Sequence, residues 1–170
     1  MPALTGPALI TAGLLVLAGA QKVLDPTMAV GALRALHLPS SPTLVRVGAG
    51  AEVVLGLAAI VVGGPVLWWL VAASYVAFGA FVAAALRSGT MIGSCGCFGR
   101  EETPPHPLHL VLDLVLAGMA GAVAVWSPEA PVDALGDAPD EGTVLVLLVG
   151  LALYLLHAAF VELPRALRAA

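Results

Sequence analysis

The stretch from Val53 to Leu86 constrains this chain more than any other feature, because it contains no charged residue. At about 1.5 Å per residue it is too long for one membrane span, which takes about 20 residues. Gly63, Gly64 and Pro65 interrupt the stretch. Proline cannot continue a helix, and glycine accepts a turn. The sequence therefore predicts two membrane-spanning helices joined by a tight hairpin.

The composition supports a membrane protein, because 60% of the 170 residues are hydrophobic and only 11% are charged. The mean hydropathy of +1.01 favours a lipid bilayer as the partner, and nothing suggests a nucleic acid. The first apolar helix has no preceding Lys or Arg, which a cleaved signal peptide needs, so it counts as a span. We predict an all-α, polytopic transmembrane helical bundle that forms a single integral-membrane domain over residues 1–170. Its four-helix core and a fifth spanning helix are expected near residues 3–21, 43–62, 66–86, 108–126 and 143–161.

Two connecting segments carry polar residues. In residues 25–42, Met28, Leu33 and Leu36 can share one face, which predicts a short interfacial helix after the first span. Residues 126–142 are rich in proline and acid, which predicts a polar loop.

The cations predict how the bundle sits in the membrane. Five spans put the N-terminus and the acidic loop on one side and every Lys and Arg on, or bordering, the other. These cations are Lys22, Arg34, Arg46, Arg87, Arg100, Arg165 and Arg168. The positive-inside rule makes the cationic side cytoplasmic and the N-terminus external. Trp68, Trp69 and Trp126 are expected in an aromatic belt at the opposite interface.

Both cysteines, Cys95 and Cys97, lie in the glycine-rich segment GSCGCFGR, which this topology puts at the cytoplasmic face. In an extended chain, residues two apart point to opposite sides, so only a tight turn at Gly96 can join the sulfurs. So small a disulfide ring is strained, and strained disulfides are labile and oxidising. The segment therefore predicts thiol–disulfide exchange through a redox-active Cys95–Cys97 disulfide.

Charged neighbours of the cysteines suggest the remaining chemistry. Arg87 and Arg100 flank the segment and favour the reactive thiolate. Either cysteine could attack an incoming disulfide while the other resolves the intermediate. His109 could move the proton, and Asp113 could orient His109 or accept the proton itself; the order of these roles stays open.

Ionisable groups inside spans usually face the bundle interior. Glu52 and Asp113 both lean toward the side of the membrane that holds the cysteines. A structural interpretation pairs Glu52 with Lys22 or Arg46, and Asp113 with Arg46 or Arg87. The gathering of acids, bases and thiols at one end favours a functional site.

Two alternatives remain. Cys95, Cys97, His106 and His109 offer ligands for zinc or copper in a metal-binding or transport protein, although their spacing is not that of a zinc finger. The protein could also be a non-catalytic membrane scaffold that recruits a partner.

Four segments resemble the MauE branch of the DoxX-like, redox-associated bacterial membrane proteins. They occur in the family's order from the first to the fourth helix, whereas the fifth helix matches only as a hydrophobic segment. Leu112 stands where the family often has a basic residue. The segments are AGAQKVLDP (Ala18–Pro26), GAGAEVVLGL (Gly48–Leu57), CGCFG (Cys95–Gly99) and HPLHLVLDLVL (His106–Leu116).

The resemblance implies a bacterial plasma-membrane protein that works with a thioredoxin-like partner to mature disulfide-containing exported client proteins. MauE itself is associated with the disulfide-rich small subunit of methylamine dehydrogenase. Lys22 and Glu52 carry over as positions typical of the family, and Cys95 and Cys97 as the redox pair. We expect thiol–disulfide exchange or electron relay, as a thiol–disulfide oxidoreductase if the protein is an enzyme. No cofactor is required; a quinone is a conjecture from the likeness of the bundle to the vitamin K epoxide reductase group.

Overall fold

The computed structural model describes residues 4–88, 105–137 and 139–169, except for the side chains of residue 139 and residues 164–169. Within these ranges every regular element is a helix, which confirms the predicted all-α class. The predicted site residues Cys95, Cys97 and Arg100 lie outside the described residues. The helices are α1 (Thr5–Leu24), α2 (Thr27–Ala35), α3 (Pro42–Val61), α4 (Pro65–Arg87), α5 (Pro107–Trp126), α6 (Pro131–Asp137) and α7 (Pro139–Ala169).

Five of these helices are long and apolar enough to cross a membrane, namely α1, α3, α4, α5 and the Asp140–Leu163 part of α7. They lie close to the predicted spans and make this a multi-pass membrane protein. Pro42, Pro65 and Pro107 stand in the first turns of α3, α4 and α5. A first-turn N–H has no helical partner, so proline loses no hydrogen bond there and marks the helix start.

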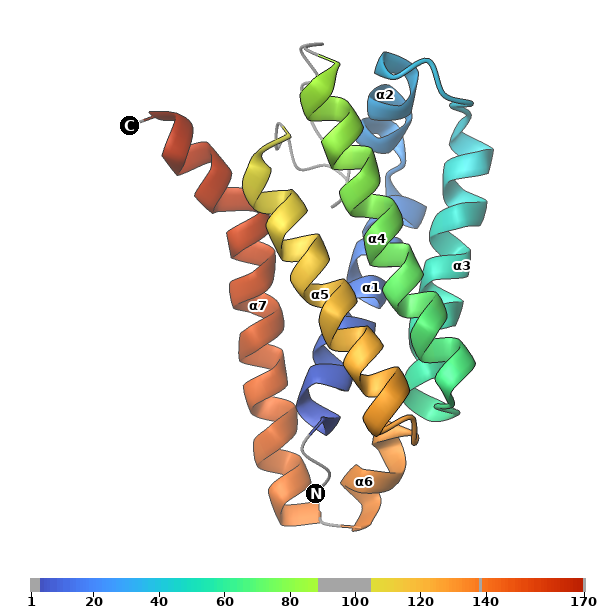
Figure 1. Cartoon of the computed structure of the whole chain (residues 1–170), viewed down its shortest axis with the longest axis vertical. Coiled ribbons are helices and arrows are strands. Elements are labelled where there is room, and N and C mark those ends of the chain that lie inside the picture. The colour runs from blue at the N-terminus through green and yellow to red at the C-terminus, as the bar shows by residue number, and fades with distance from the viewer. Residues whose placement is uncertain (1–3, 89–104, 138, 170) are drawn as a thin grey trace.

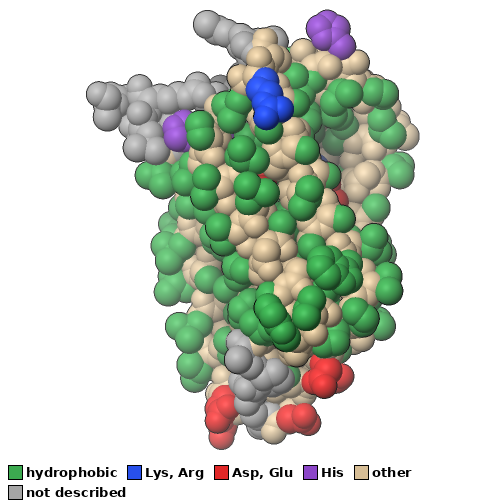
Figure 2. Space-filling model, viewed as in Figure 1, with side chains coloured by type: hydrophobic (Ala, Val, Ile, Leu, Met, Phe, Trp, Pro, Cys, Tyr) green, Lys and Arg blue, Asp and Glu red, His purple; other side chains and the backbone are tan. Residues whose placement is uncertain are grey.

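The spanning helices lie side by side and alternate in direction (Figure 1). The N-terminus, the α3–α4 turn and α6 lie at one end of the bundle, here called the α6 end. Helix α2, the end of α4, the start of α5 and the C-terminus lie at the other, the α2 end. Acidic side chains gather at the α6 end and basic and histidine side chains at the α2 end, with a hydrophobic band between them (Figure 2).

Helix α2 is the short helix predicted after the first span. Met28, Leu33 and Leu36 are half-buried, and the buried residues of the helix are Val30 and Ala32. Ala32 clusters with Ala85, so α2 also packs against the end of α4.

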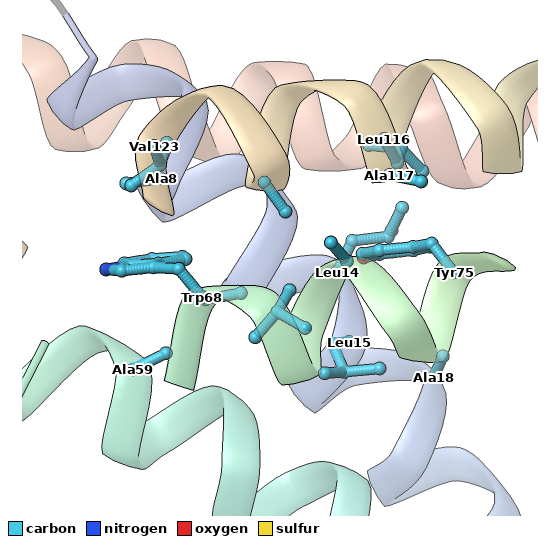
Figure 3. Close-up of a cluster of buried hydrophobic side chains, with 14 of the residues drawn as sticks. Ala8, Leu14, Leu15, Ala18, Ala59, Trp68, Tyr75, Leu116, Ala117 and Val123 are labelled. Carbon is cyan, nitrogen blue, oxygen red and sulfur yellow. The ribbon is translucent and has the colours of Figure 1, made fainter. Parts of the chain in front are cut away.

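Large side chains of α1, α4 and α5 meet in the core, among them Leu14, Trp68 and Leu116 (Figure 3). Trp68 is completely buried, so its predicted place in an aromatic belt is wrong. Successive residues of a helix face different directions, and α4 therefore turns Trp68 inward while Trp69 is 54% exposed. Trp126, which is 76% exposed, faces outward as well.

The α6 end is held together by backbone contacts. Gly63 and Gly64 have φ angles of 68° and 95°, which glycine adopts without strain, and they form the predicted hairpin turn. The Gly64 N–H donates to the Pro128 carbonyl, which ties this turn to the segment after α5. That segment is less irregular than the predicted polar loop, because Pro131 and Pro139 each begin a helix.

Candidate functional site

An ion pair joins α1 to α3 inside the bundle. Lys22 Nζ lies 2.5 Å from Glu52 Oε2, and the two side chains are only 9% and 18% exposed. The ammonium also lies 4.7 Å from the centre of the Phe78 ring on α4, which is a cation–π distance. A single charge is unfavourable in such an apolar place, so each member of the pair requires the other.

Two glycines allow α1 and α3 to approach closely enough for this pair. A Cβ on Gly19 would lie 2.8 Å from the Ala49 carbonyl oxygen, and a Cβ on Gly56 would lie 2.8 Å from the Ala12 carbonyl oxygen. Each glycine lies about one turn from the charged residue of its own helix. Small residues at such contacts are typical of packed membrane helices. Both family-like motifs of α1 and α3 therefore combine a packing glycine with a charge.

A second carboxylate approaches Lys22 from α5. Asp113 is 2% exposed, and it lines a cavity of about 30 Å³ together with Lys22 and Tyr75. Such a space is large enough for a water molecule, and these groups can hold one. The Tyr75 hydroxyl donates to the Thr11 carbonyl oxygen at 2.6 Å, which fixes α4 against α1 beside the cavity. Lys22 thus contacts one carboxylate, Glu52, and shares the wall of a small cavity with another, Asp113.

The two histidines at the start of α5 are occupied with backbone groups. His106 caps the helix, with its Nδ1 accepting from the Leu108 N–H at 3.2 Å. His109 Nδ1 accepts from the His106 N–H at 3.1 Å, and His109 Nε2 lies 2.8 Å from the Phe160 carbonyl oxygen on α7. An amide N–H only donates and a carbonyl only accepts, so the His109 ring is neutral with its proton on Nε2.

His109 is completely buried and stacks on the Phe160 ring, with the ring centres 5.7 Å apart. Moving a proton through this imidazole, as the sequence suggested, would require breaking one of its two hydrogen bonds. Its observed contacts instead join the start of α5 to α7. His109 and Asp113 lie about one turn apart, so α5 places both on the same inward face.

The remaining predicted cations lie nearer the surface. Arg46 Nε donates to the Val23 carbonyl oxygen at 3.3 Å, at the C-terminal end of α1. Arg87 is exposed at the end of α4. The structure therefore brings Lys22 and Glu52 into contact with each other and places Asp113 at a cavity that Lys22 also lines. Both arginines lie outside this cluster.

The segment with Cys95, Cys97 and Arg100 is not described, but the helices that flank it are. The end of α4 and the start of α5 both lie at the α2 end (Figure 1). The described ranges contain no group of three or more His, Cys, Asp or Glu residues placed to hold a metal ion. For the metal alternative, both ring nitrogens of His109 are already bonded to backbone groups.

Sequence reasoning missed several residues that shape the site. These are Thr11, Tyr75, Phe78 and Phe160. A signal for Phe160 was present in Pro164, four residues later. Proline has no N–H for the carbonyl one turn earlier, so the Phe160 carbonyl loses its usual helical donor and is available to His109. Figure 1 shows α7 bending near its C-terminal end.

Together, these residues can hold and pass a proton, because a buried ammonium contacts one carboxylate and lines a small cavity with a second. The nucleophiles of the proposed chemistry are the two cysteines, which lie outside the described residues.

Comparison with known proteins gives one match. The model of the family described as methylamine utilisation protein MauE matches residues 2–127. That range includes α1 to α5 and the cysteine segment, and it ends before α6 and α7. No curated protein and no solved structure matches the chain.

Proposed function

Because the chain belongs to the MauE family, we propose that it acts in methylamine utilisation as a membrane thiol–disulfide exchange or electron-relay protein. The observation that carries the proposal is the extent of the family match. It includes Cys95 and Cys97 together with the motifs that hold Lys22 and Glu52. We also propose that the family is a branch of the DoxX-like proteins and that this protein occupies the bacterial plasma membrane as a single domain.

In the proposed reaction, the thiolate of one cysteine attacks a disulfide of the partner. A new sulfur–sulfur bond forms as the partner's bond breaks, and one partner thiol leaves. The second cysteine then attacks this mixed disulfide, which forms the Cys95–Cys97 bond and releases the second partner thiol. Two electrons and two protons pass from the cysteine pair to the partner disulfide, and the reverse direction balances in the same way.

The buried polar residues support this proposal as places for the protons. We favour Asp113 over His109 as the acceptor, because Asp113 lines the small cavity with Lys22, whereas a proton on His109 Nδ1 would displace the His106 N–H. Lys22 and Glu52 would keep the charge of the site balanced while the thiols lose and regain their protons. A quinone in the membrane is the proposed acceptor if electrons leave the cysteine pair within the bilayer.

The proposed partners are a thioredoxin-like protein and a disulfide-containing client protein. The described cations Lys22, Arg34, Arg46 and Arg87 lie toward the α2 end, and Glu129, Asp133, Asp140 and Glu141 toward the α6 end. This distribution supports a cytoplasmic α2 end, with the N-terminus outside. A thiol pair at that end would take electrons from cytoplasmic thioredoxin and relay them toward exported clients.

A thiol-trapping titration in membranes tests the proposal. The redox states of Cys95 and Cys97 are followed against a dithiothreitol series in the wild type and in each single Cys→Ser variant. We expect a reversible pair, and a trapped mixed disulfide with a partner when one cysteine is missing. Cysteines that stay reduced under every oxidising condition would refute exchange.

The same variants separate the other two functions. Metal that copurifies with the wild type but not with C95S/C97S would favour a metal-binding protein. Client maturation that is unaffected by C95S/C97S would favour a scaffold.

A further inference from the structure

A second and larger cavity also has Lys22 in its wall, but Asp113 does not line it. Its volume is about 340 Å³, at the lower end of the roughly 300–1,000 Å³ typical of small-molecule sites. Its walls come from α2, α3 and α4, with Lys22 and Glu52 as its charged residues and Phe78 and Phe81 as its aromatic ones. The other lining residues are Ala29, Leu33, Leu44, Val45, Gly48, Ala49 and Ala77.

The turn at Gly63 and Gly64 holds α3 and α4 together at the α6 end, and the two helices diverge toward the α2 end (Figure 1). Between the diverging helices, Gly48 and the alanines have too little side chain to fill the space. A Cβ on Gly48 would meet no atom within 4 Å. The cavity therefore arises because the helices diverge and the side chains between them are small. The Lys22–Glu52 ion pair forms part of its wall.

Lys22 is positioned to bind a ligand in this cavity. Its side chain is nine-tenths buried, and among the described residues its contacts are Glu52 and the Phe78 ring. An ammonium has three N–H donors. One is directed to Glu52 and another can face the ring. The third can serve either a water in the small cavity with Asp113 or a molecule in this larger cavity.

The charges indicate what kind of molecule fits. The Lys22–Glu52 pair is neutral as a unit, and Asp113 already lines the smaller cavity with Lys22. A further carboxylate on the ligand would compete with these acids for the ammonium. A neutral carbonyl oxygen can instead accept from Lys22 while the ion pair stays intact. The aromatic and aliphatic walls suit the apolar remainder of such a molecule. Leu44 is 50% exposed on α3, so the cavity opens beside a membrane-spanning helix.

We propose that this cavity binds a neutral, membrane-soluble carbonyl compound, whose oxygen accepts a hydrogen bond from Lys22. The compound enters from the bilayer beside α3 and lies between α2, α3 and α4. This proposal does not depend on the chemistry of Cys95 and Cys97, and it holds for a ligand that is a redox partner or a regulator.

Binding is measured on the purified full chain in nanodiscs, with decylubiquinone as the carbonyl probe. Lauric acid and dodecane serve as the carboxylate and hydrocarbon comparisons. We expect saturable binding of decylubiquinone, seen as a rise in the unfolding temperature that increases with its concentration, and a much smaller rise with the other two. Equal effects of all three would mean that the cavity only accepts an alkyl chain and would overturn the proposal.

Two glycines of α3 provide a matched pair of variants. Gly48→Leu fills the cavity, whereas Gly50→Leu is a control, because Gly50 does not line the cavity and its Cβ would also meet nothing within 4 Å. We expect at least tenfold weaker decylubiquinone binding for G48L and unchanged binding for G50L. If G48L does not fold, Ala29→Leu fills the same cavity from α2. Unchanged binding by a folded filling variant would contradict the proposal.

The polar contact has its own test. In K22M/E52Q both members of the ion pair are removed together, so Glu52 is not left charged without Lys22. We expect this variant to bind decylubiquinone no better than dodecane. A retained preference for decylubiquinone would show that Lys22 is not the donor.

Discussion

At the scale of single residues, the site depends on how each buried polar group finds a partner. Lys22 and Glu52 could be recognised from the sequence as charges in apolar helices, because such charges rarely occur without a role. Their pairing could not be recognised, since Arg46 was an equal candidate for Glu52. Arg46 instead reaches the Val23 carbonyl at the end of α1, which is a contact no sequence pattern encodes.

Removing one member of the ion pair should destabilise the protein more than removing both. We expect K22M alone to lower the free energy of unfolding by about 3–5 kcal/mol, because Glu52 is left charged in apolar surroundings. K22M/E52Q should recover much of that loss. Thermal unfolding in detergent measures the stability of the wild type, both single variants and the double variant. The exposed Arg34→Met serves as a control. A double variant as unstable as the single one would show that the charges do not act as a pair.

The hydrogen bonds of His109 make a further residue-scale prediction. In H109N the amide oxygen can still accept from the His106 N–H, but the side chain no longer reaches the Phe160 carbonyl. Losing a buried hydrogen bond of this kind costs about 1–3 kcal/mol. We expect faster hydrogen exchange in the C-terminal part of α7, with α1 to α4 unaffected. Protection of α7 that equals the wild type would argue against the bond.

At the scale of elements, the helix boundaries were predictable and the helix contacts were not. First-turn prolines and long apolar runs fix where α3, α4 and α5 begin, and both are local properties of the sequence. Which face of a helix turns inward depends on its neighbours. Trp68 therefore could not be distinguished from Trp69 beforehand, and the packing of Ala32 in α2 against Ala85 in α4 was not foreseen.

The contact between α1 and α3 predicts a sharp difference between two glycines of α3. A Cβ on Gly56 would lie 2.6 Å from Val16 Cγ2, so G56A should destabilise the protein by about 1–3 kcal/mol and separate Lys22 from Glu52. G50A adds the same methyl group where nothing lies within 4 Å and should be neutral or slightly stabilising. Unfolding temperatures of the two variants test this, and equal values would contradict the close contact.

At the scale of the whole molecule, the charge asymmetry predicts the orientation in the membrane. Gly31 in α2 and Gly136 in α6 mark the two ends, and both are exposed with open space at the Cβ position. In a C95S/C97S background, an impermeant maleimide should label G136C on intact cells and label G31C only after permeabilisation. The reverse pattern would place the cysteine segment on the outer face, and labelling of both would contradict an odd number of spans between them.

The five-span architecture followed from the sequence because bilayer thickness limits helix length independently of tertiary contacts. The candidate site followed only in part. Its charges were visible as exceptions in apolar helices, but the cavity beside Lys22 arises from the divergence of α3 and α4, which is a property of the assembled bundle.

The bond between His109 and the Phe160 carbonyl connects the part of the chain that the family model matches with a helix beyond it. A protein cut back to the matched core would lose the Phe160 carbonyl that His109 Nε2 contacts. Helix α7 therefore contributes to the fold of the matched core, and we expect His109 and Pro164 to occur together in related chains. Related chains that lack α7, or that lack a proline at the position of Pro164, are expected to have another residue in place of His109.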